Sequence, residues 1–176
     1  MFGRVRVSGR ALLVVIALLT AAPVWSQSAS TGTVLNAAEA TKLLPASVFF
    51  SGQSAPVQAR NSGGIKFGDG MLVLAALIDT SGYSSAVQQK YQTYLITEGA
   101  ILINDHLLPP GAYGAGFVAG KFGVMDIGGH DMFSADATHD AELKRPTPLQ
   151  FIAGGSAGEF RLYQGRDYVV ITAPHQ

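Results

Sequence analysis

The residues best suited to chemistry lie between Gly128 and Glu142, where histidines and carboxylates are closely spaced. Imidazole and carboxylate groups together bind zinc and similar divalent ions, and a catalytic site uses two or three of them with a water molecule. The spacing matches no recognised ligand motif, and adjacent side chains diverge in an extended chain. The candidate metal ligands of this stretch are His130, Asp131, His139 and Asp140.

A second candidate is the segment Gly154-Gly155-Ser156-Ala157-Gly158, which matches the G-x-S-x-G pattern of serine hydrolases. Asp167 and His175 follow it in the order Ser, Asp, His. A nucleophile elbow needs a strand before the serine and a helix after it. Residues 159–163 have the pattern of another strand, so we interpret the segment as a glycine turn. The sequence therefore offers no complete catalytic set, and we expect no catalytic residue and no cofactor.

The first 26 residues have the organisation of a secretory signal peptide. Three arginines precede an apolar run at residues 11–22, and small residues end the segment at Ser26. The apolar run is shorter than the roughly 20 residues that a membrane-spanning helix needs. We therefore expect cleavage near Ser26 and Gln27, no stable transmembrane segment afterwards, and a periplasmic or secreted location in a bacterium.

The charge balance excludes one class of partner. The whole chain has 12 Lys+Arg and 12 Asp+Glu, and loss of Arg4, Arg6 and Arg10 leaves 9 against 12, a net charge of minus three. Nucleic-acid binding needs a basic patch, so we expect no nucleic-acid partner. The chain contains no cysteine, which means that an exported form is stabilised by its core without disulfide bonds.

The composition and the spacing of short apolar runs indicate the fold class. Charged residues make up 14% of the chain and there are 21 glycines, which argues against a helical bundle. Short β-prone runs alternate with turn residues, and this predicts an all-β fold. We expect an antiparallel β-sandwich or small barrel of about nine strands with one or two short helices. The expected organisation is a signal peptide at 1–26, a disordered lead-in at 27–35 and a single β-domain at 36–176.

Several local elements follow from capping and turn signals. Asn36 followed by Glu39 is a capping-box pattern, which predicts a helix from Ala37 to Leu44, and a second short helix is expected at residues 84–90. The unbroken apolar run at 71–78 favours a central strand over a buried helix. We further expect a turn at 61–64 and a long loop without periodicity at 128–148.

The segment 98–129 reads as a β-meander of three runs. The predicted turns between them are Asn104-Asp105, Pro109-Pro110-Gly111 and Ala119-Gly120-Lys121. In the middle run, small residues including Gly114 and Gly116 alternate with larger ones, so one face of this strand is nearly bare. A bare face indicates that another backbone packs closely or that the strand bends, and less often that it floors a ligand groove.

The start of this run carries a family resemblance. Leu108-Pro109-Pro110-Gly111-Ala112-Tyr113, with an apolar strand on each side, resembles the L-P-x-G-x-Y hairpin of exported bacterial β-sandwich proteins, several of them of unknown function. The resemblance implies an extracytoplasmic β-domain, and it carries no catalytic residues.

These observations favour a non-catalytic role over an enzyme. We expect an exported β-sandwich domain that binds a protein, peptide or glycan ligand or associates with the cell envelope, in part because glycine-rich edge strands invite β-augmentation. The alternative is a metal-binding protein or metal-dependent hydrolase that uses the loop from Gly128 to Glu142. Tyrosines could line a sugar- or peptide-binding face, although tyrosine in strands is more often half-buried core.

Overall fold

The structure of the chain is a computed structural model that describes Gly3 and residues 32–174. Apart from Gly3, the predicted signal peptide at 1–26 lies outside the described residues, as do most of the predicted lead-in and His175. In chain order the elements are β1 (Thr33–Leu35), α1 (Ala37–Ala40), β2 (Ser47–Phe50), β3 (Gln53–Lys66), β4 (Leu72–Ile78), α2 (Ser85–Lys90), β5 (Thr93–Thr97), β6 (Ile101–Ile103), β7 (His106–Leu108), β8 (Gly111–Val118), β9 (Lys121–Met125), β10 (Asp131–Asp136), β11 (Thr138–His139), β12 (Thr147–Ala153), β13 (Phe160–Gly165) and β14 (Asp167–Thr172).

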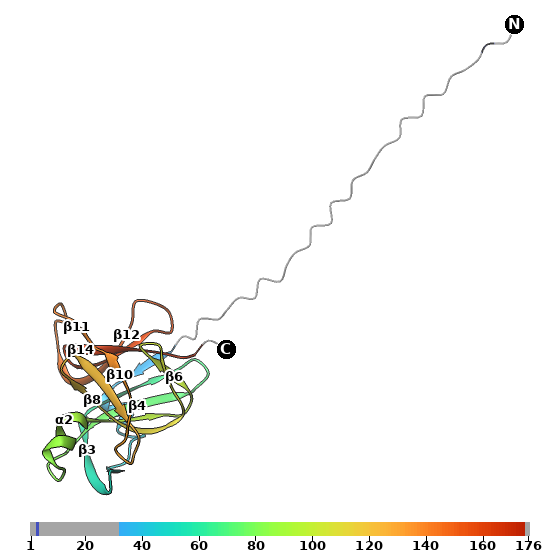
Figure 1. The fold of residues 1–176 in the computed structure, drawn as a ribbon. Coiled ribbons are helices and arrows are strands. Elements are labelled where there is room, and N and C mark those ends of the chain that lie inside the picture. Colours follow the sequence, from blue (N-terminus) through green and yellow to red (C-terminus); the bar gives the residue numbers. More distant parts are fainter. Residues whose placement is uncertain (1–2, 4–31, 175–176) are drawn as a thin grey trace.

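The strands form two antiparallel sheets that pack face to face (Figure 1). The eight-stranded sheet has the order β1-β3-β4-β5-β8-β9-β10, with β2 paired to β3, and the six-stranded sheet has the order β12-β13-β14-β6-β7, with β11 paired to β14. The predicted all-β class is confirmed. Of the two architectures we expected, the fold is the sandwich, since the described strands form two sheets and do not close into a barrel.

The main core lies between the two sheets, as alternation along each strand requires. The fully buried side chains there come from both layers: Ile65, Val73, Leu95, Phe122 and Val124 from one sheet, and Ile101, Ile103, Leu162, Val169 and Ile171 from the other. A second cluster covers the outer face of the eight-stranded sheet and includes Phe50, Tyr83, Tyr91 and Met125. The eight-stranded sheet is therefore buried on both faces over part of its area.

This two-sided burial explains why β4 is almost entirely apolar. β4 pairs with β3 on one side and with β5 on the other, which confirms the predicted central strand. Val73 and Ala75 face the main core, whereas Ile78 belongs to the outer cluster. A strand that is buried on both faces reads as a continuous apolar run without alternation.

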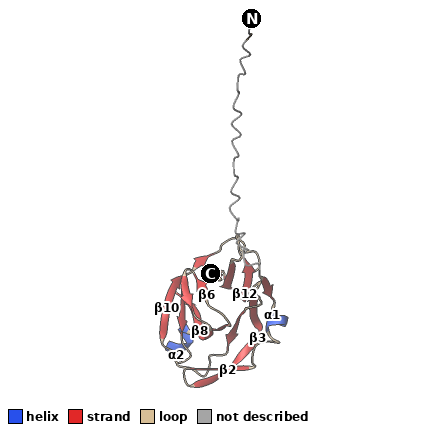
Figure 2. Cartoon of the chain, turned by 90° about the vertical axis from the view of Figure 1, so that its right-hand side faces the viewer, coloured by secondary structure: helices blue, strands red, loops and turns tan. Residues whose placement is uncertain are grey.

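Both predicted helices are present, α1 beside β3 and α2 beside β8 (Figure 2). At α1 the capping box is complete: Asn36 Oδ1 accepts from the N–H groups of Ala38 and Glu39, and Glu39 Oε2 accepts from the N–H of Asn36 at 2.9 Å. The helix ends at Ala40, earlier than expected, and turns lead on to Pro45. α2 lies within the range 84–90 that we expected, and Ser84 is its N-cap.

The predicted meander is wrong in one respect. Its first run, β6, pairs with β14 and β7 in the six-stranded sheet, whereas β8 and β9 belong to the eight-stranded sheet. The turns are as expected, because Asn104 and Asp105, and likewise Ala119 and Gly120, have the positive φ that two-residue hairpin loops require. The sequence did not predict the short strand β7. This strand pairs with β6, and the chain crosses to the other sheet directly after it.

The segment Leu108–Tyr113 is the crossover between the sheets. The Tyr113 hydroxyl donates to the carbonyl oxygen of Pro109 at 2.8 Å. This is the geometry of a tyrosine corner, in which a tyrosine near the start of a strand fixes the backbone that leads into it. The proline pair has no N–H to offer a ladder, so the chain leaves one sheet at this point and enters the other.

Three further expectations are corrected. Thr33–Leu35 are not disordered: they form β1, because Val34 pairs with Ile65 in β3 and packs on the main core. Residues 61–64 are not a turn but part of the long strand β3, whose register shifts between Val57 and Ser62. The segment 128–148 is not a loop throughout, since it contains β10 and β11, and with β1 and β7 these raise the strand number above about nine. Within the described residues, neither helix is long and apolar enough to cross a membrane.

Candidate binding groove

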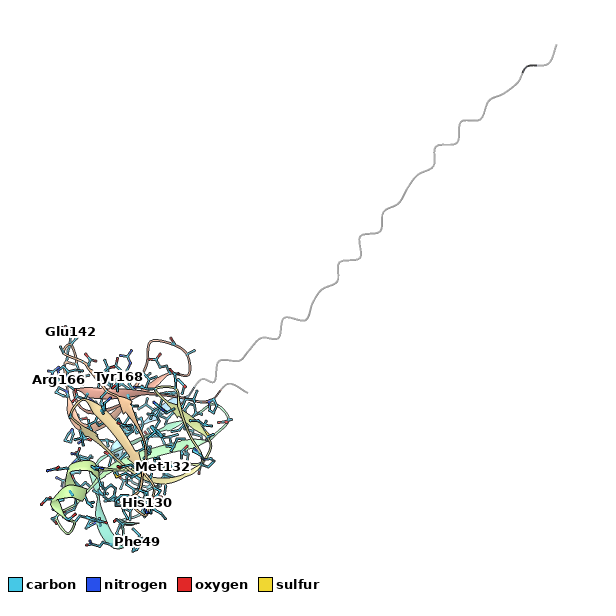
Figure 3. All side chains as sticks on the ribbon, viewed as in Figure 1. Phe49, His130, Met132, Glu142, Arg166 and Tyr168 are labelled. Atoms are coloured by element: carbon cyan, nitrogen blue, oxygen red, sulfur yellow. The ribbon has the colours of Figure 1, made fainter. Side chains whose placement is uncertain are left out.

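The two histidines that we predicted as metal ligands lie in separate carboxylate pairs. His130 Nδ1 is 2.9 Å from Asp126 Oδ2, within the turn between β9 and β10. His139 Nδ1 is 2.6 Å from Asp167 Oδ1, across the β11–β14 pairing. Figure 3 shows His130 toward the end of the molecule that carries Phe49, away from Glu142 and Arg166.

The two predicted carboxylate ligands are also engaged elsewhere. Asp131 Oδ2 is 2.8 Å from the Lys90 ammonium group, and Asp140 Oδ2 accepts from the Tyr163 hydroxyl at 2.9 Å. Among the described residues, no three side chains of metal-ligating type gather in one place. The structure therefore does not bring His130, Asp131, His139 and Asp140 together. The first two lie at the start of β10 and the last two at the end of β11, and these strands belong to different sheets.

The G-x-S-x-G segment forms the connection between β12 and β13, as we interpreted it. The N–H of Gly154 donates to the carbonyl of Glu159, and the N–H of Glu159 donates to the carbonyl of Ser156. A strand follows it where a nucleophile elbow needs a helix. Asp167 pairs with His139, and the candidate base His175 lies outside the described residues.

The bare face of β8 is covered at Gly114 and Gly116 by β2 and by the end of α2. A Cβ atom at Gly116 would lie 2.2 Å from the carbonyl oxygen of Lys90, and one at Gly114 would lie 2.3 Å from the Phe50 ring. Both distances are below any normal contact, so only glycine allows this approach. The close packing of another backbone, which the sequence indicated, is therefore confirmed at Gly116.

On the side of β8 away from β5, toward β9 and β10, the same face of the sheet is open. There it forms the floor of a groove of about 370 Å³. Gly116 pairs with Gly123, and Gly123 pairs with Ser134, so three small residues stand in one row across β8, β9 and β10. Nothing lies within 4 Å of a Cβ placed on Gly123. The lining residues are Lys90, Gly116, Val118, Lys121, Gly123, Met125, Asp131, Met132, Phe133 and Ser134.

The walls of the groove are apolar and its charges stand in pairs. Lys90 pairs with Asp131, and Lys121 pairs with Asp136, with every one of these side chains more than half exposed. The Lys121 ammonium group donates to the Asp136 carboxylate and holds its pKa below the ordinary value. Because the two pairs cancel, the groove presents apolar surface without a net charge.

The aromatic cluster beneath α2 fixes one wall. The rings of Phe50 and Tyr91 stack with centroids 3.6 Å apart, and the Tyr83 ring meets that of Tyr91 edge to face at 5.6 Å. The Tyr83 hydroxyl donates to the carbonyls of Phe50 and Gln53. Tyr91 directly follows Lys90, so this packing holds the end of α2 against β8. The tyrosines therefore serve the core here and not a ligand face.

The sequence reasoning missed most of the groove. Gly116 was identified, but Met132 and Ser134 lay inside the segment that we expected to be a loop. The signal that could have found them is the run from Asp131 to Asp136, where three apolar residues and one serine stand between two acidic ends, as in a short protected edge strand.

The fold and the groove define the chain as an all-β, two-sheet sandwich protein with an apolar trough on the outer face of its larger sheet. Comparison with known proteins gave no match: no family model fits the chain, and no curated protein or solved structure is significantly similar to it.

Proposed function

We propose that this chain is an exported, non-catalytic binding domain that holds an apolar side chain of a peptide or protein ligand in the groove of β8, β9 and β10. The observation that carries this proposal is the row Gly116, Gly123 and Ser134, which leaves a trough where neighbouring strands normally bear larger side chains. Ligand sites are typically concave, largely apolar and already formed in the free protein.

The lining favours an apolar peptide group over the glycan that the sequence left open. Val118, Met125 and Met132 supply apolar contact, and methionine side chains adapt to ligands of different shape. A sugar needs several uncommitted polar groups, whereas the ionisable groups of the groove already pair with one another. An exposed ion pair contributes little free energy, so an apolar group can bind beside these pairs at little energetic cost.

The non-catalytic role is supported by the chemistry around the groove. Among the described residues, Ser134 is the one hydroxyl of its lining, and no histidine lines it. A serine nucleophile requires a base within hydrogen-bonding reach. Export is supported by the leader-like residues 1–26 and by the resemblance of Leu108–Tyr113, and N-terminal sequencing of protein from the periplasm and medium tests it, with Gln27 as the expected first residue.

The groove is tested by nuclear magnetic resonance of methionine methyl groups. The chain has four methionines, of which Met125 and Met132 line the groove, while Met71 contacts Gly99 elsewhere and serves as an internal control. N-acetyl-leucine amide, a small model of an apolar side chain, should shift the signals of Met125 and Met132 and leave Met71 in place.

A matched pair of variants tests the location. Gly123→Leu should fill the trough and abolish the methyl shifts, whereas Gly155→Leu, at a second glycine with open space around its Cβ, should leave them unchanged. Equal shifts at all three methionines, or shifts that survive Gly123→Leu, would overturn the proposed function.

A further inference from the structure

The strand beside the groove is the end of a sheet. Among the described strands, β10 is the last of the eight-stranded sheet, and β9 is its one partner. An edge strand presents unpaired N–H and C=O groups on its outer side, and these can bind an extended peptide as an additional strand. Ser134, in the middle of β10, is exposed.

The register shows which backbone groups of β10 point outward. In an antiparallel pair, residues alternate between positions that exchange both backbone hydrogen bonds and positions that exchange none. The N–H of Ala137 donates to the carbonyl of Gly120, so the next bonded position is Ala135 with Phe122. Ser134 and Asp136 therefore direct their N–H and C=O groups away from β9.

A side-chain contact confirms this direction. Asn104 Nδ2 donates to the backbone carbonyl of Asp136 at 2.6 Å, from the side of β10 opposite to β9. The Asn104 amide thus occupies one acceptor of the edge in the way that a neighbouring strand would. No residue in the described part of the chain bonds to the outward N–H and C=O of Ser134, so these two groups form the centre of a short open edge.

The charges along this edge define the partner. Asp131 Oδ2 and Asp136 Oδ1 contact Lys90 and Lys121, which belong to α2 and β9. One oxygen of each carboxylate remains for a partner on the outer side, where the exposed Asp105 also lies in the turn next to Asn104. Oppositely charged residues on adjacent strands stabilise their pairing, and like charges destabilise it.

A second copy of the chain fits this edge poorly. Antiparallel pairing of two β10 strands would place Asp131 and Asp136 of both copies along one seam. Lys90 and Lys121 contact these carboxylates from α2 and β9, so they do not lie between the two copies, and the like charges would meet across the seam. Charged residues of this kind are a common protection of edge strands against self-association. A peptide with basic residues meets no such repulsion.

We infer that β10 binds an extended peptide as a ninth strand of the large sheet, with backbone hydrogen bonds to Ser134, an apolar residue beside Met132 at the groove, and lysine or arginine facing Asp131 or Asp136. The inference rests on the proposed function and names its ligand class. Backbone bonds supply affinity in this mode, and alternate side chains supply specificity.

The probe is the peptide acetyl-Lys-Thr-Val-Thr-Val-Lys-amide, with binding followed by fluorescence anisotropy of a labelled form and by the Ser134 amide signal. Ser134→Pro removes the outward N–H without removing a bond to β9, and proline is tolerated at such edge positions. We expect Ser134→Pro to weaken binding by about tenfold or more, as loss of one or two hydrogen bonds predicts, and Ser134→Ala to bind within about twofold of the parent. Replacement of both peptide lysines by glutamate should also weaken binding by about tenfold.

A measurement on the peptide guards against a variant that fails to fold. N-methylation of the two central valines removes peptide donors, leaves the protein unchanged and should abolish binding. Equal binding of the methylated peptide, or of Ser134→Pro in its folded form, would overturn strand addition. If N-acetyl-leucine amide still shifts the Met132 signal in that case, the groove proposal is kept without strand addition. A dimer that forms in sedimentation experiments and depends on Ser134 would show that the partner of β10 is a second copy of the chain and not a peptide.

Discussion

Asn104 in the β6–β7 turn donates a hydrogen bond from Nδ2 to the backbone carbonyl of Asp136 in β10, at 2.6 Å. Its Oδ1 accepts from the N–H of Val170 in β14 at 2.7 Å. One amide side chain therefore joins an edge of the eight-stranded sheet to the interior of the six-stranded sheet. Asn104 also has a positive φ of 43°, a conformation that asparagine tolerates better than most residues.

Substitutions of Asn104 should separate what its backbone conformation and its side-chain hydrogen bonds each contribute to the free energy of unfolding. Asn104→Gly keeps the left-handed conformation and loses both hydrogen bonds, so the free energy of unfolding should fall by about 2 kcal/mol. Asn104→Ala adds backbone strain and should lose about 1 kcal/mol more. Asn104→Asp keeps an acceptor for Val170 but places a carboxylate against the Asp136 carbonyl, and should also destabilise. Urea unfolding measures all three, and a glycine variant as stable as the parent would show that the bridge contributes nothing.

The outer aromatic cluster contains a buried hydroxyl without a partner. Tyr91 is fully buried and its hydroxyl has no hydrogen-bond partner among the described residues, whereas the Tyr83 hydroxyl has two acceptors. Tyr91→Phe should therefore raise the free energy of unfolding by about 1 kcal/mol, and Tyr83→Phe should lower it by about as much. Thermal and urea unfolding of the two variants provide a matched comparison, which equal effects would contradict.

The same burial predicts a response to alkaline pH. Burial, with smaller contributions from Tyr83 and Tyr94, strongly raises the pKa of Tyr91 above its ordinary value of 10.0. A raised folded-state pKa means that stability is complete below the unfolded pKa and is lost as the pH rises above it. Between about pH 10 and pH 12, stability should fall less steeply with pH in Tyr91→Phe than in the parent. Ultraviolet absorbance at the tyrosinate band measures the ionisation of the tyrosines over this range.

Two glycines of the groove floor should respond differently to alanine. A Cβ at Gly116 meets the Lys90 carbonyl oxygen, a backbone atom that α2 holds in place. Gly116→Ala should cost roughly 2 kcal/mol of unfolding free energy, as overpacking typically does. Gly123→Ala has open space and should be neutral or slightly stabilising. A Gly116 variant with unchanged stability would mean that α2 moves freely on β8.

The carboxylate of Asp126 predicts a response to acid. The backbone N–H of His130 donates to the Asp126 carboxylate at 3.0 Å, and this bond is the main reason why the pKa of Asp126 is lowered below 3.8. A lowered pKa gives stability that is present above the unfolded value and is lost as the pH falls through the folded value. Asp126→Asn should therefore flatten the fall of stability below about pH 4, whereas Asp105→Asn, at a carboxylate with no hydrogen-bond partner among the described residues, should not.

The alternative that the segment 128–142 binds a metal ion can be tested by a direct measurement. Each histidine faces one carboxylate in a different part of the fold, so we expect protein dialysed against zinc and then buffer to retain well under one equivalent. Metal analysis of protein without a histidine tag checks this. One full equivalent, lost in both His130→Ala and His139→Ala, would restore the metal hypothesis.

The sequence alone determined the features that depend on neighbouring residues. The capping box of Asn36 and Glu39 and the hairpin loop at Ala119-Gly120 need only a few adjacent residues, so their patterns were sufficient. The apolar run of β4 and the all-β class followed from composition and spacing in the same way. The bare face of β8 indicated close backbone packing, although not which backbone would lie there.

The tertiary structure decided everything that depends on which strands become neighbours. β6 and β8 are close in sequence, yet the Pro109-Pro110 crossover places them in different sheets. The groove exists because Gly116, Gly123 and Ser134 fall in register across three strands, and no local pattern records that alignment. Side-chain alternation fixes the face of each residue within a strand, whereas register between strands depends on the packing of the whole core.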